Sequence, residues 1–600
     1  MKKIIFIVAL CVFYAAGSAA SFAQEKMPPE GWQHKSFEFD SVYGAGVNSA
    51  YRLLKGRKPA KTVTVALVGY GMDVEQRDLT GAIWKNPGEK PNGKDDDKNG
   101  YADDLHGWNF LGTPDGKSLN RLSRVGDREF FRLKDKYARY IFVGGKCYTL
   151  DSLAQQVMQV APPDNRAEFD YFRNVVLPES PIGGRYVGVM FAKMVVAFVH
   201  DADSALRQKY PGKTLTKRDF EAVYDGFSPD TLTNYFAGSV QLLFMSVGRE
   251  SWDAVRQFAD TGYVQYQQKS YERRLRNTFL GERKYIGDNP YDINDRRYGN
   301  SNLASANAGQ GVALAALIGA RRSNGVGIDG VAEQVKIMSL RVDADLYGEP
   351  YMKDMALAIR YAASNGADII QLGKTNAIYP QPWSAWVDDA LRYAEQKGAL
   401  VVIPMMDLSY NLDNKPFYPM RRTDGGELSN VITVAASDAG GNPYRTVNFS
   451  NTALDIFAPG VAIKTVAPGA QSAKAEVGGK GGKQVGVFES AEVIKSAARE
   501  EEEGCAIASG SELAAAIVSG VAALVKSYYP KIAPAEMRKL LMDTVTPRND
   551  AEVEKSFVIY NNGVPGRQVK DVFMFKDLSV SGGILNAEKA LTEAEKRYGK

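Results

Sequence analysis

A short acidic stretch between residues 94 and 104 of this 600-residue chain has oxygen-bearing side chains that could bind a metal ion. Oxygen-bearing side chains stand at Asp95, Asp97, Asn99 and Asp103 around Gly100, and the main-chain carbonyl of Tyr101 completes the series. This spacing matches the first nine positions of an EF-hand-type calcium loop, although the last position holds His106 in place of glutamate. Crowded carboxylates repel one another unless a cation neutralises them. The stretch predicts a structural calcium site, and the alternative is a solvated acidic turn.

A second stretch of interest predicts a buried helix that follows a glycine-flanked turn. Residues 509–525, SGSELAAAIVSGVAALV, are apolar and rich in small side chains after the first turn. Free N–H groups and the helix dipole stabilise negative charge at such an N-terminus, and nucleophilic serines are displayed in this way. In this chain the displayed residue is Glu512.

The elements around these stretches indicate an α/β fold. Residues 62–68, TVTVALV, predict a buried strand that ends in a turn at Gly69 to Gly71. A dinucleotide site is disfavoured there, because Val74 stands where the third glycine of the GxGxxG fingerprint belongs. Later segments, such as 354–375 and 386–413, each predict a helix followed by a buried strand.

Four of these segments together resemble the subtilase (subtilisin-like serine peptidase) family. Residues 65–79, VALVGYGMDVEQRDL, resemble its aspartate segment, and residues 308–342 resemble its histidine segment, with a continuous alignment from Gly311 to Leu340. Residues 386–413 resemble the segment that carries the oxyanion asparagine, and 509–525 align without a gap with the serine segment. The resemblance implies a subtilisin-like three-layer α/β fold with a mostly parallel central sheet.

The same resemblance assigns the catalytic positions to unusual residues. Gly69 stands at the aspartate, Gln310 at the histidine, Glu512 at the serine and Asp407 at the oxyanion asparagine. Peptide hydrolysis by this family needs all four groups acting as a unit. The three histidines of the chain, His34, His106 and His200, lie outside the aligned histidine segment. We therefore expect no functional catalytic residues, which describes a pseudoprotease.

Three functional hypotheses follow from these residues. The leading one is a catalytically inactive homologue that acts by binding a peptide or protein partner. The alternative is an active serine endopeptidase, as the family implies. A third possibility is a new use of the site, in which Glu512 and Asp407 converge and share a proton or bind a cation.

The chain divides into five parts on these patterns. Residues 1–23 predict a secretory signal peptide, with Lys2 and Lys3 before an apolar run and small residues at its end, so we expect export to a periplasmic or extracellular location. The other predicted parts are a lead-in at 24–60, a first core part with the calcium-like loop at 61–111, a helical insertion at 112–284 and a second core part at 285–600.

Composition excludes some classes of partner. Removing Lys2 and Lys3 with the signal peptide leaves 72 basic and 70 acidic residues, so charge gives no argument for nucleic acid. No segment after the signal peptide predicts membrane insertion, and Tyr186–Val199 fits a core helix because Lys193 interrupts it. Cys147 and Cys505 would remain after processing, and the sequence leaves open whether they pair.

Overall fold

The computed structural model describes residues 27–151, 156–224, 231–248, 250–304, 308–344, 348–373, 375–423, 425–466, 505–549, 551–561 and 564–599. The predicted signal peptide lies outside these residues.

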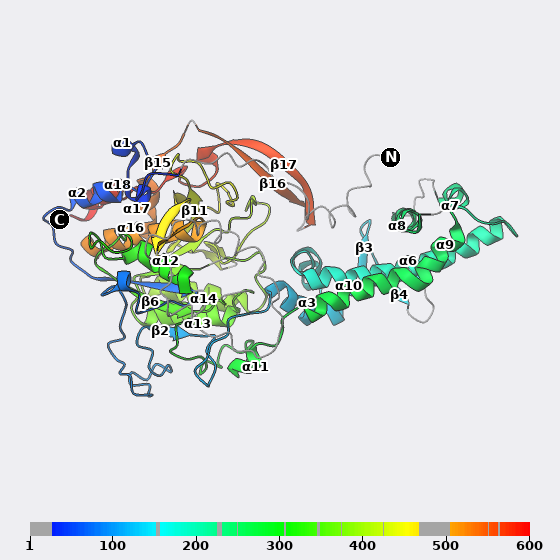
Figure 1. Ribbon diagram of the computed structural model, residues 1–600, viewed down its shortest axis with the longest axis horizontal. Coiled ribbons are helices and arrows are strands. Elements are labelled where there is room, and N and C mark those ends of the chain that lie inside the picture. The colour runs from blue at the N-terminus through cyan, green and yellow to red at the C-terminus, as the bar shows by residue number, and fades with distance from the viewer. Residues whose placement is uncertain are drawn as a thin grey trace.

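A nine-stranded sheet forms the centre of the described chain, and Figure 1 shows it in the larger of two bodies. The order is β15-β18-β12-β11-β8-β7-β1-β6-β2, and every pair is parallel except β15 with β18. The strands are β1 (Val63–Gly69), β2 (Gly107–Asn109), β6 (Val335–Arg341), β7 (Ile369–Leu372), β8 (Leu400–Pro404), β11 (Val431–Ser437), β12 (Ile456–Pro459), β15 (Thr546–Pro547) and β18 (Gly583–Ile584).

The central strands form because short apolar runs are buried on both faces of a parallel sheet. All residues of β7, β8 and β11 are buried. β1 lies between β6 and β7, where Val65 is in register with Ile337 and Ile369. The α/β class and the mostly parallel sheet expected from the sequence are confirmed.

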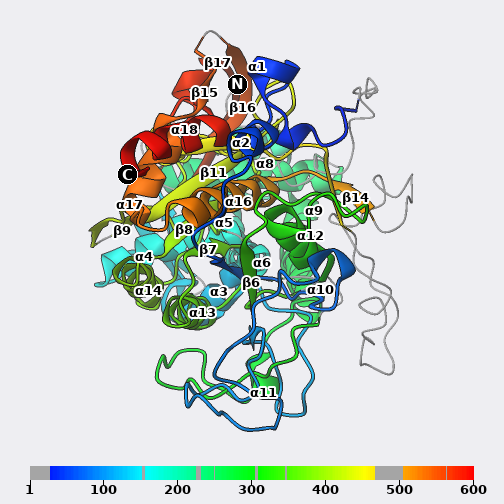
Figure 2. The same cartoon turned by 90° about the vertical axis from the view of Figure 1, so that its left-hand side faces the viewer.

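Helices cover both faces of the sheet, as Figure 2 shows. On one face α12 (Ala308–Gly319) packs against α16 (Ser511–Tyr528), and on the other α13 (Met352–Ser364) packs against α14 (Ser384–Gln396). α16 is a core helix, since all of its residues except Glu512, Lys526 and Tyr528 are buried. Further core helices are α11 (Arg283–Ile286), α17 (Pro534–Asp543) and α18 (Ala587–Tyr598).

A long arm, residues 125–276, extends away from this core in Figure 1. Its helices are α3 (Val125–Tyr137), α4 (Arg166–Tyr171), α5 (Leu177–Glu179), α6 (Pro181–Lys209), α7 (Lys217–Tyr224), α8 (Thr231–Val247), α9 (Trp252–Phe258) and α10 (Val264–Arg276). The arm has its own apolar clusters, centred on residues such as Phe130 and Phe172 near the core and Phe220 and Trp252 further out.

The arm also contains an antiparallel sheet that the sequence interpretation did not include. Its strands are β3 (Ile141–Val143), β4 (Lys146–Asp151) and β5 (Gln156–Val160). Among the described helices, α6 and α16 are long and apolar enough to cross a membrane. α16 lies inside the core, and α6 contributes Met194, Val195 and Val199 to the outer apolar cluster of the arm.

The two ends of the described chain meet on the core. α2 (Val47–Leu53) packs against α18, and α1 spans Phe37–Asp40. A long hairpin of β16 (Glu552–Asn561) and β17 (Val564–Met574) was not expected. Short pairs join β9 (Arg422–Thr423) to β10 (Gly426–Glu427) and β13 (Ile463–Val466) to β14 (Cys505–Ala508). Cys147 and Cys505 form no disulfide.

Candidate functional site

The four positions singled out in the sequence lie at the ends of strands or at the starts of helices, at one edge of the sheet. Gly69 is the last residue of β1, and Asp407 follows the end of β8. Gln310 lies in the first turn of α12, and Glu512 is the second residue of α16. The carboxyl edge of a parallel α/β sheet is where such folds place their ligand sites.

Gln310 and Glu512 contact each other directly. The Nε2 group of Gln310 donates a hydrogen bond to Oε2 of Glu512, and both side chains are partly exposed. Gln371, which is buried at the end of β7, donates from Nε2 to the main-chain oxygen of Glu512 at 3.2 Å and accepts from Ser519 Oγ at 3.0 Å. These contacts fasten the first turns of α16 to α12 and to the sheet.

Asp407 is bound to the start of the same helix. Its Oδ2 accepts from the main-chain N–H of Ser511 at 2.9 Å, and its Oδ1 accepts from the Ser511 hydroxyl at 2.6 Å. Gly510 supplies no side-chain cap, so Asp407 takes that role from a different part of the chain. Burial raises the pKa of Asp407, and the hydrogen bonds from Ser511 and the charge of Lys555 oppose that rise.

Lys555 on β16 places a second buried ionisable group near Asp407. Its side chain is 2% exposed, and its Nζ donates to the carbonyl oxygens of Val447 at 3.0 Å and Arg445 at 3.3 Å. Burial lowers the pKa of Lys555 to about 8, while Asp407 acts in the opposite direction. The unexpected hairpin of β16 and β17 therefore contributes a charge close to the position of Asp407.

Gly69 brings no side chain to this edge, and its backbone is closely packed. A Cβ atom on Gly69 would lie 3.2 Å from the Cα of Gly373. The carbonyl of Gly69 accepts from the N–H groups of Val342 at 2.9 Å and Asp343 at 3.0 Å. An aspartate at position 69 would require Gly373 to move by a few tenths of an ångström.

The three histidines of the chain are engaged elsewhere. Nε2 of His34 lies 3.0 Å from the Asp329 carbonyl, and burial lowers the pKa of His34 to about 4. Nδ1 of His106 lies 2.7 Å from the Trp84 carbonyl, and Nε2 of His200 pairs with Asp260 in the arm at 2.6 Å. None of these imidazoles contacts Glu512 or Ser511 in the described chain.

Ser511 is the serine next to Glu512, and its hydroxyl is held inside the protein. The residue is 2% exposed, and its Oγ accepts from the N–H of Ala436 at 3.1 Å while donating to Asp407. A nucleophile must reach its substrate and pass its proton to a base. The Ser511 hydroxyl is bonded on both sides and has no imidazole beside it, so it does not meet these requirements.

The acidic loop forms a carboxylate cluster with one unexpected member. Glu89 comes together with Asp95 and Asp97, with one carboxylate oxygen from each within 4.8 Å of the others. The other expected ligands have different partners. Asp103 accepts from the N–H groups of Asn92 and Gly93, and Asn99 donates to Asp97 and Asp104. Residue spacing could not indicate Glu89 as a member, because the loop must fold back to bring it to the other two carboxylates.

Three carboxylates at this separation suit a hard cation that prefers oxygen ligands, so the cluster fits calcium. Glu89 is buried, and its two oxygens accept from the N–H groups of Asp97 and Asp103 at 3.0 Å, which orients the cluster. Tyr101 packs with its ring in edge contact with Trp108 and Tyr361, which fixes the loop to the core.

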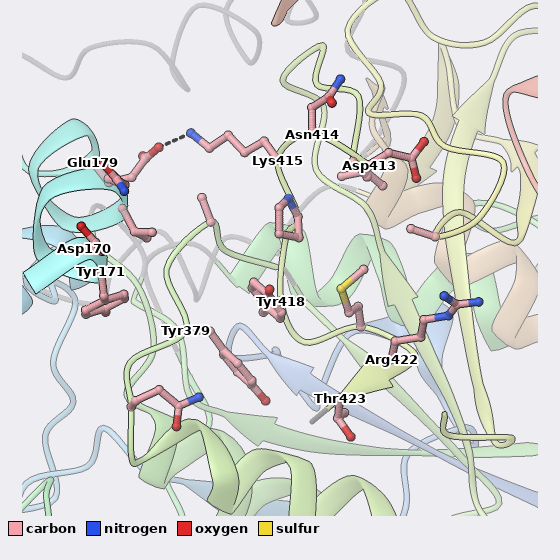
Figure 3. A pocket seen from close by; sticks show the side chains of 18 of the residues that line it. Asp170, Tyr171, Glu179, Tyr379, Asp413, Asn414, Lys415, Tyr418, Arg422 and Thr423 are labelled. Atoms are coloured by element: carbon pink, nitrogen blue, oxygen red, sulfur yellow. Dashed lines mark hydrogen bonds and ion pairs between the residues drawn. The ribbon is translucent and has the colours of Figure 1, made fainter. Parts of the chain in front are cut away.

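A crevice of about 1210 Å³ opens between the arm and the core. One wall consists of residues 166–179 of the arm, and the other consists of residues 377–388, 412–423 and 452–453, including loops that follow β7 and β8. Figure 3 shows Glu179 and Lys415 reaching toward each other as an ion pair. Below them the rings of Tyr379 and Tyr418 stack 4.9 Å apart. The sequence could not reveal this crevice, because its walls are about 200 residues apart in the chain.

Comparison with known proteins gives consistent matches. The Subtilase family (Peptidase_S8) model matches residues 60–559. The chain is 31% identical over 181 residues to the thermophilic serine proteinase of Bacillus sp. (strain AK1), covering 30% of this chain and 40% of that relative. It is 26% identical over 317 residues to fervidolysin of Fervidobacterium pennivorans, covering 51% and 39%. The chain thus spans less than half the length of either relative.

Two solved structures each match about half of this chain. The crystal structure of fervidolysin covers 50% of this chain and 38% of its own, at 23% identity and a TM-score of 0.34. The epidermin leader peptide processing serine protease of Staphylococcus aureus covers 53% and 68%, at 19% identity and a TM-score of 0.34. The family match together with the large, mostly parallel sheet and the helices on both of its sides identifies the fold of the core as subtilisin-like.

Proposed function

We propose that this chain, which belongs to the subtilase family, has no serine-peptidase activity and binds a peptide or protein partner. The relative from Bacillus sp. (strain AK1) is a thermophilic serine proteinase. The serine mechanism needs a nucleophilic serine, a histidine to move its proton, an aspartate to orient the histidine and a donor for the oxyanion. Glu512, Gln310, Gly69 and Asp407 supply none of these functions.

The observation that carries the proposal is the pair of contacts at the start of α16. Asp407 directs its carboxylate to Ser511, and Gln310 donates to Glu512. A carboxylate at the oxyanion position would repel the negative charge that develops on the substrate oxygen. The groups at these positions are used to fix a helix, so they support a scaffold role rather than a reaction.

Binding is supported by the crevice beside this edge of the sheet. Loops that follow β7 and β8 form one of its walls, and the arm forms the other. Clefts at the carboxyl ends of parallel strands are common ligand sites in α/β proteins. A polypeptide lying in the crevice would contact the core and the arm at once.

Two further parts of the proposal concern location and calcium. Export to a periplasmic or extracellular location rests on the predicted signal peptide at residues 1–23. Calcium binding rests on the carboxylates of Glu89, Asp95 and Asp97, which would hold the ion and thereby tie the loop to the fold.

The test of inactivity uses the mature chain with fluorescein-labelled casein and a fluorophosphonate probe that labels activated serines. We expect no labelling and no release of fluorescent fragments under conditions in which an active subtilisin does both. Labelling of a defined serine together with casein turnover would refute the proposal and favour the serine endopeptidase alternative.

The test of binding uses the same casein in an anisotropy measurement. Asn414 is exposed and lines the crevice, so Asn414→Trp is expected to weaken binding by filling it. Asn48→Trp places the same ring on α2 and serves as the matched control. Equal binding by the two variants, or no binding by the unmodified chain, would contradict a role for the crevice.

A further inference from the structure

We propose that the crevice between the arm and the core selects acidic polypeptide segments, an inference that rests on the proposed binding function and adds the chemistry of the ligand. The crevice is lined by five basic and four acidic side chains. The acidic side chains all have hydrogen-bond or ion-pair partners within the protein, whereas some of the basic side chains are not fully paired.

Each acidic side chain of the lining already accepts from a neighbour. Asp170 accepts from Arg166 at 2.9 Å and from Arg173 at 3.1 Å, so one carboxylate serves two guanidinium groups. The carboxylate of Glu179 is paired with Lys415. The remaining two acids accept from hydroxyl groups, Asp388 from Tyr379 at 2.8 Å and Asp413 from Ser450 at 2.7 Å and Thr452 at 2.6 Å.

The basic side chains leave positive charge on both walls. On the arm, the single carboxylate of Asp170 is shared by the guanidinium groups of Arg166 and Arg173, so it balances only one of their two positive charges. On the core wall, Arg422 is exposed, and its guanidinium has no hydrogen bond or ion pair with any described residue. Figure 3 places Asp170, the carboxylate shared by Arg166 and Arg173, on the wall opposite Arg422. Guanidinium groups bind carboxylates with two parallel hydrogen bonds, which makes a carboxylate the matching ligand group.

The size of the crevice favours a polypeptide over a small anion. Its volume of about 1210 Å³ exceeds the range of about 300–1,000 Å³ that is usual for small-molecule pockets. An extended peptide projects successive side chains to opposite sides, so neighbouring acidic residues reach both walls. The stacked rings of Tyr379 and Tyr418 offer an apolar surface on the core wall, beside its charged side chains.

The walls are joined by a buried network at the base of the arm. Glu282 accepts from the N–H of Ser123 at 2.8 Å and from the Tyr351 hydroxyl at 2.9 Å, which links both ends of the arm to the core. Arg283 pairs with Asp354 at 2.6 Å, and both side chains are buried. This network holds the crevice in shape before a ligand arrives, which lowers the cost of binding.

Fluorescence anisotropy with three 12-residue fluorescein-labelled peptides tests the inference. One alternates Glu with Ser, and the others carry Gln or Lys in place of Glu. We expect the Glu peptide to bind at least about tenfold more tightly than the Gln peptide, and more weakly as salt is added. Arg422→Ala and Arg166→Ala should each weaken its binding about threefold to fivefold, whereas Arg321→Ala, an exposed arginine outside the crevice, should not.

The outcomes separate this inference from the proposed function. Equal affinity for the Glu and Gln peptides, with no effect of Arg422→Ala, overturns acidic selectivity and leaves peptide binding standing. Failure of all three peptides to bind overturns the inference, and failure of casein to bind as well overturns the proposed function. A fluorescein-labelled 12-nucleotide oligothymidine that binds as tightly as the Glu peptide would show general polyanion binding and overturn a polypeptide-specific site.

Discussion

Asp407 accepts both hydrogen bonds that Ser511 donates, one from the main-chain N–H and one from the hydroxyl. The position that the subtilase resemblance assigns to an oxyanion donor is therefore occupied by an acceptor. This acceptor stabilises the first turn of α16, a buried helix of the core, so the aspartate at this position has a structural consequence that can be measured.

Replacing Asp407 with alanine is expected to lower the free energy of unfolding by about 1–3 kcal/mol, because it leaves the buried donors of Ser511 unsatisfied. Asp407→Asn keeps one acceptor oxygen and should cost less. Urea denaturation of both variants measures the effect, with Asp135→Asn, an exposed acid on the arm, as the control. An Asp407→Ala variant as stable as the unmodified chain would contradict the capping role.

Lys555 should make stability depend on pH in the alkaline range. Its pKa is about 8 in the folded protein and about 10.4 in an unfolded chain, so the unfolded state binds more protons between these values. The free energy of unfolding should therefore rise with pH over this interval, by about 3 kcal/mol at most for this one group. Lys555→Met removes the titration, and the difference between the two proteins isolates the effect. A difference in the free energy of unfolding between the two proteins that stays constant with pH would contradict this prediction.

Calcium should stabilise the chain through the carboxylate cluster. An ion that binds only the folded state at 100 times its dissociation constant adds about 2.7 kcal/mol, so chelation should lower the melting temperature by several degrees. Glu89→Gln and Asp97→Asn should abolish the response, because both belong to the cluster. Asp103→Asn should reduce it less, since Asp103 bonds to Asn92 and Gly93. If a chelator changes the melting temperature of neither the unmodified chain nor the Asp135→Asn control, a calcium site at this cluster is excluded.

Breaking the buried ion pairs at the base of the arm should loosen the arm. Arg283→Met leaves Asp354 and Asp288 without their guanidinium partner, and removal of one partner from a buried pair costs about 3–5 kcal/mol. The Arg283→Met substitution should accelerate amide hydrogen exchange more in α3 and α10 of the arm than in β1 and β11 of the central sheet. Arg207→Ala breaks exposed pairs within the arm and should change exchange little. Unchanged protection of α3 in Arg283→Met would mean that other contacts anchor the arm.

The core could be predicted because its segments carry strong local signals. The apolar run before Gly69 and the small-residue helix after Gly510 lie where the sequence places them. Local signals also existed for the unexpected strands. Gly144 and Gly145 form the tight turn between β3 and β4, and the sequence Asn562-Gly563 is a hairpin signal between two alternating runs.

The site could be predicted only as a set of positions. The residue types at Gln310, Glu512 and Asp407 were readable, but their hydrogen-bond partners depend on how α12, α16 and β8 pack. Glu89 and the crevice walls depend on contacts between segments far apart in the chain, which periodicity and spacing do not encode.

The close approach of Gly69 and Gly373 limits how this scaffold can be redesigned. Installing serine, histidine and asparagine at positions 512, 310 and 407 would still leave the orienting carboxylate to be added at the end of β1. Its Cβ would press on the Gly373 backbone, which is itself fixed by a 2.7 Å hydrogen bond to Val68. A designer converting this protein into a peptidase would therefore have to shift the junction of β1 and β7 by a few tenths of an ångström as well as change the reacting groups.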